Sequence, residues 1–270
     1  MKTTVLLVNL GTPNSPEPKE VRRYLNEFLL DPDVIDAPWL LRQFLVRRVI
    51  VPRRYKESAE SYSKIWSQQG SPLLFHSENI AKALAKKLEG EVDVELAMRY
   101  QNPSLPSVLK RIEQKGCDRL IVLPLFPQYS TATTGTIKKR IDKLLAKWRT
   151  KPELEVIDHF ANEPHFIRTL AENGSMATEY DHILFSFHGL PQSYLTKTDK
   201  SRRCLASPDC CANRPLADNC YRSHCLATAH AIAGELYLTP DQYTICFQSR
   251  LGKKEWLKPY ATETIKNLAN

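Results

Sequence analysis

The sequence predicts an α/β fold in which parallel β-sheets are flanked by helices. Short apolar runs alternate with longer amphipathic segments along all 270 residues, which is typical of parallel strands joined by helical crossovers. Several apolar runs end in a turn containing Gly or Pro, as at Gly11–Pro13 and Gly189–Pro191. The length suffices for two domains. We expect them to be joined near residues 126 to 150 and to comprise residues 1–126 and 127–270.

The elements of the first half follow from periodicity and from turn residues. TVLLVNLGTP reads as a buried strand, after which Ser15 is the expected N-cap of a helix with Pro16 at its first position. Ser71 is likewise expected to cap a helix that starts at Pro72. We expect strands at 4–13, 92–100 and 119–126, and helices at 15–30, 39–51, 53–66, 71–88 and 105–114.

The second half repeats the alternation. A hydroxyl-rich turn, PQYSTATTG, precedes its first helix, and a cysteine-rich segment at 199–220 separates two later elements. The chain ends in the start of an amphipathic helix with no strand after it, so we expect a truncated chain. The expected strands lie at 154–157, 182–187 and 243–248, and the expected helices at 136–148, 164–173, 221–236 and from 262 onward.

Composition excludes some classes of protein. No apolar stretch approaches the 18 or so residues of a membrane span, and the N-terminus is a poor signal peptide, so we expect a cytoplasmic protein. The net charge of +8 suits an acidic partner, which leaves nucleic acid, an anionic membrane surface or a small carboxylate ligand open. The basic residues are dispersed, which disfavours a nucleic-acid groove. Peripheral membrane contact stays an alternative.

Polar side chains at strand ends are the first candidates for a site. His188 ends the apolar run ILFSF, and ligands of parallel sheets bind at the carboxyl ends of strands. Taken alone, a turn histidine bonded to the backbone is the commoner role. Arg99 and Tyr100 end another strand, and the turn at 127–135 suits an anion, although such hydroxyls more often cap helices.

Cysteine usage is more specific. Five of the seven cysteines lie between positions 204 and 225, whereas Cys117 and Cys246 are isolated. In a reducing compartment, clustered cysteines are more often metal ligands than disulfides. Four thiolates suffice for an iron–sulfur cluster or for zinc. Because the side chains of neighbouring residues diverge, we do not expect Cys210 and Cys211 both to bind, and we favour Cys211. The five candidates are Cys204, Cys210, Cys211, Cys220 and Cys225.

Six motifs, in order along the chain, give the sequence a resemblance to ferrochelatases. Each is weak alone, but their number and order make coincidence a poor explanation. The motifs are VNLGTP (8–13), SYSKIW with GSPL (61–73), MRY (98–100), LFPQYSTATTG (125–135), FSFHGLP (185–191) and FQSRLGKKEWLKP (247–259).

The resemblance implies both a fold and a reaction. The implied chelatase fold has two similar Rossmann-like domains, each a parallel sheet flanked by helices, with a porphyrin cleft between them. The implied reaction inserts ferrous iron into protoporphyrin IX, the terminal step of haem synthesis. Iron and porphyrin would thus be substrates, and nucleic acid would not be a partner.

The resemblance also assigns residues. His188 matches the family histidine that accepts pyrrole protons or ligates the incoming metal. Asn9 and Leu10 match the strand edge that meets the macrocycle, and Arg99 and Tyr100 match an inner wall. The other implied porphyrin contacts are Arg54, Tyr62, Ser71, Gln128, Tyr129 and Ser130.

Two departures from the family pattern leave alternatives open. Ferrochelatases continue past WLKP with a strand and a glutamate that faces the histidine, and no residue here matches that glutamate. The cysteine segment resembles that of bacterial members with a 2Fe-2S cluster, with zinc as the alternative. Besides ferrochelatase we therefore keep two alternatives: a porphyrin-binding or iron–sulfur sensor without metal insertion, and a chelatase for another metal such as cobalt.

Overall fold

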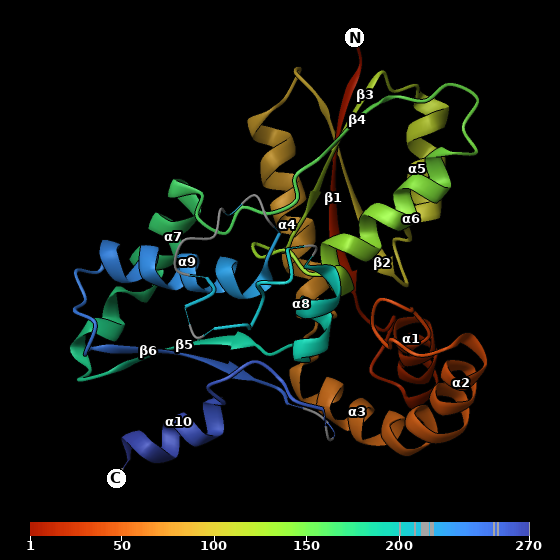
Figure 1. The fold of residues 1–270 in the computed structure, drawn as a ribbon. Coiled ribbons are helices and arrows are strands. Elements are labelled where there is room, and N and C mark those ends of the chain that lie inside the picture. The colour runs from red at the N-terminus through yellow and green to blue at the C-terminus, as the bar shows by residue number, and fades with distance from the viewer. Residues whose placement is uncertain are drawn as a thin grey trace. The chain divides into compact units, whose positions relative to one another are not determined.

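The computed structural model describes residues 1–199, 201–207, 209–211, 216, 219–250, 252 and 254–269. Helices and strands alternate along these residues, as predicted (Figure 1). In chain order they are β1 (Thr3–Gly11), α1 (Pro18–Leu29), α2 (Trp39–Phe44), η1 (Leu45–Ile50), α3 (Val51–Ile65), α4 (Pro72–Lys87), β2 (Asp93–Tyr100), α5 (Leu105–Lys115), β3 (Arg119–Pro124), η2 (Thr131–Gly135), α6 (Thr136–Leu145), β4 (Glu153–Val156), α7 (Pro164–Gly174), η3 (Ser175–Glu179), β5 (Ile183–His188), α8 (Gln192–Thr198), α9 (Tyr221–Glu235), β6 (Tyr243–Gln248) and α10 (Ala261–Leu268).

The chain divides into two compact units. Unit 1 comprises residues 1–126 and 131–158, and unit 2 comprises 127–130 and 159–270. Residues 131–158, which the sequence analysis placed in the second domain, therefore belong with the first. The reason is pairing and packing: β4 runs parallel to β3, and α6 contributes to the core beneath the same sheet.

Unit 1 is built on a parallel sheet of strand order β2-β1-β3-β4. The central strand β1 pairs with β2 on one side and with β3 on the other. Its residues Leu6, Leu7 and Val8 are fully buried. A strand covered on both faces reads as a continuous apolar run, which explains why TVLLV could be recognised in the sequence.

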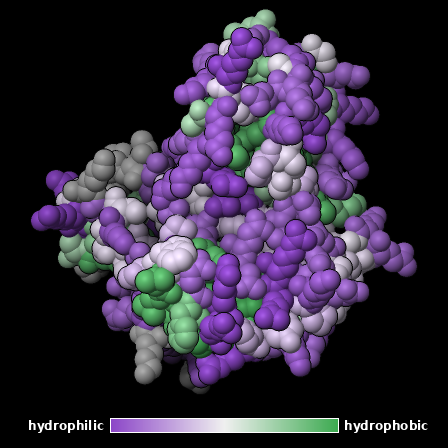
Figure 2. Space-filling view, turned by 90° about the vertical axis from the view of Figure 1, so that its right-hand side faces the viewer, coloured by the Kyte–Doolittle hydropathy of each residue, from purple (hydrophilic) through white to green (hydrophobic). Residues whose placement is uncertain are grey.

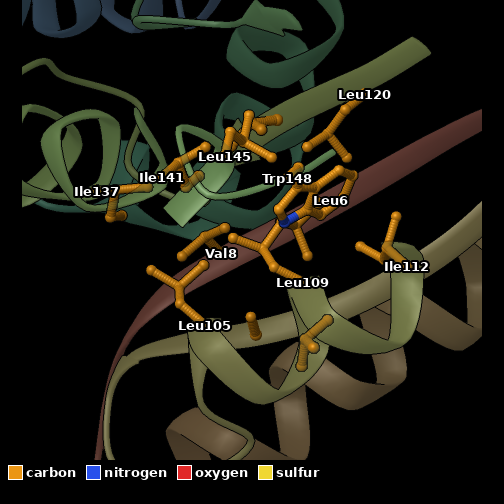
Figure 3. Packing of buried hydrophobic residues seen from close by; sticks show 13 residues of the cluster. Leu6, Val8, Leu105, Leu109, Ile112, Leu120, Ile137, Ile141, Leu145 and Trp148 are labelled. Carbon is orange, nitrogen blue, oxygen red and sulfur yellow. The ribbon is translucent and has the colours of Figure 1, made fainter. Parts of the chain in front are cut away.

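The core of unit 1 gathers side chains from the sheet and from two helices. Leu6, Leu120, Leu109 and Ile141 point toward one another from β1, β3, α5 and α6, with Trp148 among them (Figure 3). Each buried aliphatic side chain of this size contributes about 1.5–3 kcal/mol to folding. This packing fixes the carboxyl ends of the strands, where predicted site residues lie.

Unit 2 carries a smaller sheet. Its described strands β5 and β6 pair in parallel from Ile183–Tyr243 to His188–Gln248. Helices α7 and α9 pack together through a small apolar cluster that includes Ile167, Ala171 and Ile232. The seven-residue helix α8 was not predicted from the sequence. None of the described helices combines the length and apolarity needed to cross a bilayer.

Two helix boundaries differ from the sequence-based expectation because of proline. The first helix begins at Pro18 with Glu17 as N-cap, not at Ser15, because a residue before proline disfavours the helical conformation. The expected break between 51 and 53 is absent. Instead α2 passes through a π-helical segment, η1, into α3, whose second residue is Pro52. Proline lacks an N–H and crowds the preceding turn, and a wider turn accommodates it.

Candidate functional site

The carboxyl end of β1 carries the first predicted site residues. Asn9 donates from Nδ2 to Oγ of Ser77 on α4 (3.0 Å) and accepts the N–H of Leu10 at Oδ1 (2.8 Å). The buried hydroxyl oxygens of Thr12 and Ser71 lie 2.8 Å apart. Ser71 is the N-cap residue of α4 as predicted, but its hydroxyl makes no cap hydrogen bond. Its side chain instead joins the helix start to the strand end.

Gly11 is required by a close backbone approach. It pairs with Tyr100 where β1 and β2 end, and its φ is +110°. A Cβ at this position would lie 1.9 Å from the Tyr100 carbonyl oxygen, which no side chain tolerates. The glycine thus brings the end of β1 against the end of β2, which carries Arg99 and Tyr100.

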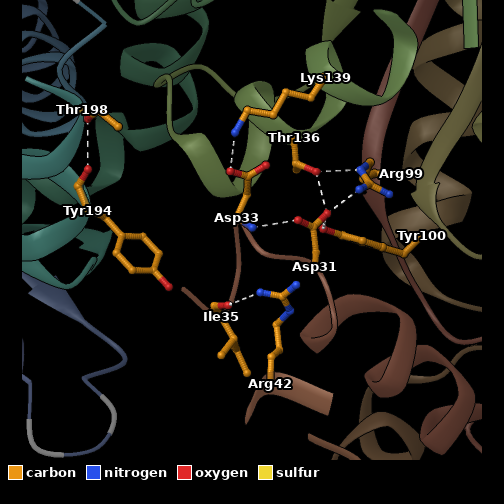
Figure 4. Close-up of polar contacts among 10 residues, drawn as sticks. All are labelled: Asp31, Asp33, Ile35, Arg42, Arg99, Tyr100, Thr136, Lys139, Tyr194 and Thr198. Atoms are coloured by element: carbon orange, nitrogen blue, oxygen red, sulfur yellow. Dashed lines mark hydrogen bonds and ion pairs between the residues drawn. The ribbon is translucent and has the colours of Figure 1, made fainter. Parts of the chain in front are cut away.

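Arg99 and Tyr100 both bind a buried carboxylate, that of Asp31 (Figure 4). Arg99 donates from Nη2 to Oδ2 of Asp31 and from Nε to Oγ1 of Thr136 (2.9 Å). Thr136 donates in turn to Asp31 (2.7 Å), as does the Tyr100 hydroxyl (2.9 Å). The other Asp31 oxygen accepts the N–H of Asp33 (2.8 Å). The network ties β2 and α6 to the segment after α1.

Charge and hydrogen bonds decide the ionisation of this network. Burial alone would raise the pKa of Asp31, but hydrogen bonds from Thr136 and the Asp33 N–H and the Arg99 charge outweigh it and lower the pKa. Burial raises the pKa of Tyr100, so its hydroxyl stays a donor. Arg99 is therefore engaged within unit 1 by a partner that the sequence analysis did not name.

Helix α3 places Arg54 and Tyr62 in different surroundings. Tyr62 lies in a row of aromatic rings, edge-on to Tyr24 at 6.2 Å and to Trp66 at 6.4 Å between centroids. Burial raises its pKa. Arg54 is exposed and, among the described residues, pairs with no carboxylate. Its guanidinium is therefore free to bind an anionic ligand.

The loop at 127–130 belongs to unit 2 and is held by α9. Gln128 donates from Nε2 to Oγ1 of Thr228 (3.0 Å), and the Tyr129 N–H donates to Nδ1 of His224 (3.1 Å). Nε2 of His224 therefore carries the proton and donates to a carbonyl (2.7 Å). Burial lowers the pKa of His224, which favours this neutral form. Ser130 is buried.

His188 is the last residue of β5, where the sequence predicted it. Its side chain is exposed, and its ring lies edge-on to that of Trp256, 6.4 Å between centroids. Although the side chain is exposed, the groups around the ring partly desolvate it and lower the pKa of His188. The imidazole is therefore neutral at neutral pH and can accept a proton or bind a metal ion. Its carbonyl accepts the Tyr221 hydroxyl (2.7 Å).

The predicted cysteines gather in one part of unit 2. Four of them pack in a single apolar cluster with Leu195, Phe247 and Leu257; these are Cys204, Cys211, Cys220 and Cys225. Among the described residues, no three His, Cys, Asp or Glu side chains are arranged to hold a metal ion. The thiols therefore lie near one another without forming a closed site.

Cys210 and Cys211 do not diverge as the sequence analysis expected. Their sulfur atoms lie 3.8 Å apart, and Nη1 of Arg222 donates to both, at 3.5 and 3.3 Å. Cys211 also shares a hydrogen bond with Cys220, which with burial raises the Cys211 pKa. Cys210 lies outside the apolar cluster and accepts a backbone N–H.

Residues whose partners are distant in the chain could not be recognised from the sequence. Asp31 is 68 residues from Arg99 and 105 from Thr136. The only local signal was a carboxylate directly after the apolar pair Leu29–Leu30. Tyr221 gave no signal, because an aromatic residue at a helix start is ordinarily core packing.

The chain is similar to known proteins over its whole length. The family model named Ferrochelatase matches residues 2–270. The ferrochelatase of Bdellovibrio bacteriovorus is 41% identical over 99% of this chain and 80% of its own length. That of Coxiella burnetii (strain Dugway 5J108-111) is 43% identical over 99% and 76%. A solved structure, SirB from Bacillus subtilis with Fe3+, aligns with a TM-score of 0.47 and 12% identity over 99% of this chain and 71% of its own.

Proposed function

The chain belongs to the ferrochelatase family, whose members are enzymes that insert a metal ion into a porphyrin in haem synthesis, and we propose that its substrates are ferrous iron and protoporphyrin IX. The observation that carries the proposal is His188, a neutral and exposed imidazole at the carboxyl end of a parallel strand. Insertion replaces two pyrrole N–H protons by Fe²⁺. The products are protohaem and two protons, so a nearby base is needed.

His188 supplies that base in the proposed mechanism. A neutral ring nitrogen accepts a pyrrole proton as the metal displaces it, and then releases the proton to solvent, to which the side chain is open. Because the pKa of His188 is lowered, the base is unprotonated at neutral pH and ready for the next proton. Its carbonyl is held by Tyr221, which fixes the backbone on which the ring stands.

Residues of unit 1 are proposed to bind the macrocycle. Arg54 would donate charge-assisted hydrogen bonds to a propionate, because its guanidinium is exposed and has no carboxylate partner among the described residues. Asn9 and Leu10 would contact the ring from the end of β1. Arg99 and Tyr100 serve in this proposal as a wall held rigid by Asp31, since their polar atoms bind that carboxylate.

The cysteines are proposed to hold a 2Fe-2S cluster. The donor set fits in kind and number: four thiols, Cys204, Cys211, Cys220 and Cys225, already pack in one apolar cluster of unit 2. Cys210 would be the residue left over. Such a group supplies covalent cross-links between chain segments, and the segment from 199 to 219 has few apolar residues to hold it otherwise.

The decisive experiment is His188→Ala. Loss of the base should reduce kcat for iron insertion about 10²- to 10⁴-fold while porphyrin affinity stays within about tenfold. The rate of the parent protein should fall on the acid side as His188 gains a proton, below the ordinary histidine pKa of about 6.5. His165→Ala, an exposed histidine on α7, is the matched control. An unchanged insertion rate in His188→Ala would refute the assignment, and faster insertion of cobalt than of iron would refute the proposed metal.

A further inference from the structure

The start of α9 contacts three segments of unit 2 that carry predicted site residues. Tyr221 reaches the end of β5, Arg222 reaches the Cys210–Cys211 pair, and His224 accepts from the loop at 127–130. These contacts all come from the first turn of one helix. A displacement of any of the three segments therefore acts on the same helix, α9.

Tyr221 makes the contact with the most direct bearing on His188. Its hydroxyl donates to the His188 carbonyl (2.7 Å), and the N–H of Gly189 donates to the carbonyl of Gln248 (2.8 Å). The peptide group that follows His188 is therefore hydrogen-bonded at both its oxygen and its nitrogen. Because that peptide plane sets the backbone torsion at His188, the two bonds together fix the direction of the imidazole.

The Tyr221 side chain also contacts the cysteines. Cys225 lies four residues after Tyr221, one helical turn away on the same face. Tyr221 packs against the apolar cluster that contains Cys225 and Cys220. Cys225 is fully buried. Cys220, the N-cap of α9, directly precedes Tyr221. Tyr221 thus packs against the thiols with its ring and hydrogen-bonds the end of β5 with its hydroxyl.

We propose that Tyr221 is a positioning residue that couples the cysteine group to His188. Whatever holds the thiols in place, a cluster or a metal ion, also holds Tyr221, and Tyr221 holds the peptide on which the imidazole stands. The catalytic part of this inference rests on the proposed function of His188. The structural part, that the thiols control the order of the strand end, does not.

Tyr221→Phe in the full chain with its metal or cluster bound tests the coupling. Removing one hydrogen bond should lower kcat about two- to tenfold, with the KM for porphyrin and the iron and sulfide contents unchanged. Amide exchange of Gly189, followed without porphyrin by NMR, should become faster. Tyr243→Phe is the matched control, because its hydroxyl bonds His230 in the same unit (2.8 Å) and should leave both readouts unchanged.

A double-mutant cycle separates coupling from general destabilisation. Cys225→Ala should accelerate Gly189 exchange when Tyr221 is present and add little when Phe replaces it. Additive effects, an unchanged kcat and exchange in Tyr221→Phe, or loss of iron from that variant would each overturn the proposal. If the parent protein inserts no iron, the proposed function fails, and the Gly189 exchange rates still decide the coupling.

Discussion

The two units reach order by different means. Unit 1 has a four-stranded parallel sheet, a large apolar core and a buried carboxylate that receives four hydrogen bonds. In unit 2 the described sheet has two strands, the apolar clusters are small, and one of them contains four cysteines. Packing is sufficient to hold the strand ends of the first unit. In the second unit, His188 is connected through Tyr221 to a cluster of thiols, and these thiols become cross-links only when they bind a ligand.

This difference indicates which unit is suited to ligand recognition and which to a change in local order. A surface prearranged by packing, as in unit 1, presents donors at fixed positions and suits recognition of a rigid planar ligand. A strand end connected to a group of thiols, as in unit 2, can be ordered or released with the state of that group. We expect perturbations of the two units to differ accordingly in size and in kind.

The largest expected effect is that of Cys220→Ser. If thiols hold unit 2 through a bound cluster, this change should release iron and sulfide and raise the rate of proteolytic cleavage in unit 2 by more than about tenfold. Amide exchange in β1 of unit 1 should not change. Cys117→Ser is the control, because the serine hydroxyl can still donate to the Arg119 carbonyl. Retained colour, iron and protease resistance in Cys220→Ser would show that this thiol is not a ligand. If the unmutated protein is colourless and contains zinc, the thiols bind zinc instead of a 2Fe-2S cluster.

Asp31→Ala tests whether packing and ion pairing alone maintain unit 1. It leaves the largely buried Arg99 without its counter-charge and should cost about 3–5 kcal/mol of unfolding free energy, measured by urea denaturation. Asp33→Ala is the control two residues away. Its partner Lys139 is exposed, so the loss should stay below about 1 kcal/mol. Equal losses in the two variants would show that the network contributes little.

The same network predicts a pH dependence. The pKa of Asp31 is lowered in the folded protein, so the carboxylate stabilises the fold above its unfolded-state pKa of about 3.9 and loses that contribution as pH falls through the lowered value. Asp31→Ala should therefore flatten the acid limb of the stability profile. If the unfolding free energy of Asp31→Ala falls with decreasing pH as steeply as that of the parent protein, other carboxylates cause the acid destabilisation.

The smallest effect is expected for Arg54→Ala. Its side chain is exposed, so the free energy of unfolding should stay the same, whereas porphyrin binding should weaken by about 1.5–3 kcal/mol. For a porphyrin without carboxylates, the loss of binding free energy caused by Arg54→Ala should be much smaller. Titration of both proteins with each porphyrin measures the two losses. Arg53→Ala, the exposed neighbour on α3, controls for net charge. Equal losses for both porphyrins would indicate a packing contact instead of a propionate contact.

Features that depend on neighbouring residues in the sequence could be predicted, whereas contacts between residues distant in the sequence could not. The fully buried run Leu6–Val8 and the strand end at His188 are local patterns, and both were predicted. Asp31 and Tyr221 act on residues 68 and 33 positions away, and no local pattern encodes such pairs. Residues 131–158 were assigned to the wrong unit because the sequence shows that a strand exists at 153–156 but not which strand it pairs with.

The π-helical segment at 45–50 sets the rotation of everything after it in the same continuous helix. A π-turn contains one residue more than an α-turn, so Arg54 and Tyr62 are turned by about 100° from where an unbroken α-helix would put them. The direction in which Arg54 and Tyr62 point therefore depends on the length of the segment before them as well as on the two residues themselves. Deletion of one residue between 45 and 50 would restore the ordinary winding, move the arginine off its face and take the tyrosine out of its aromatic row, although neither residue had itself been altered.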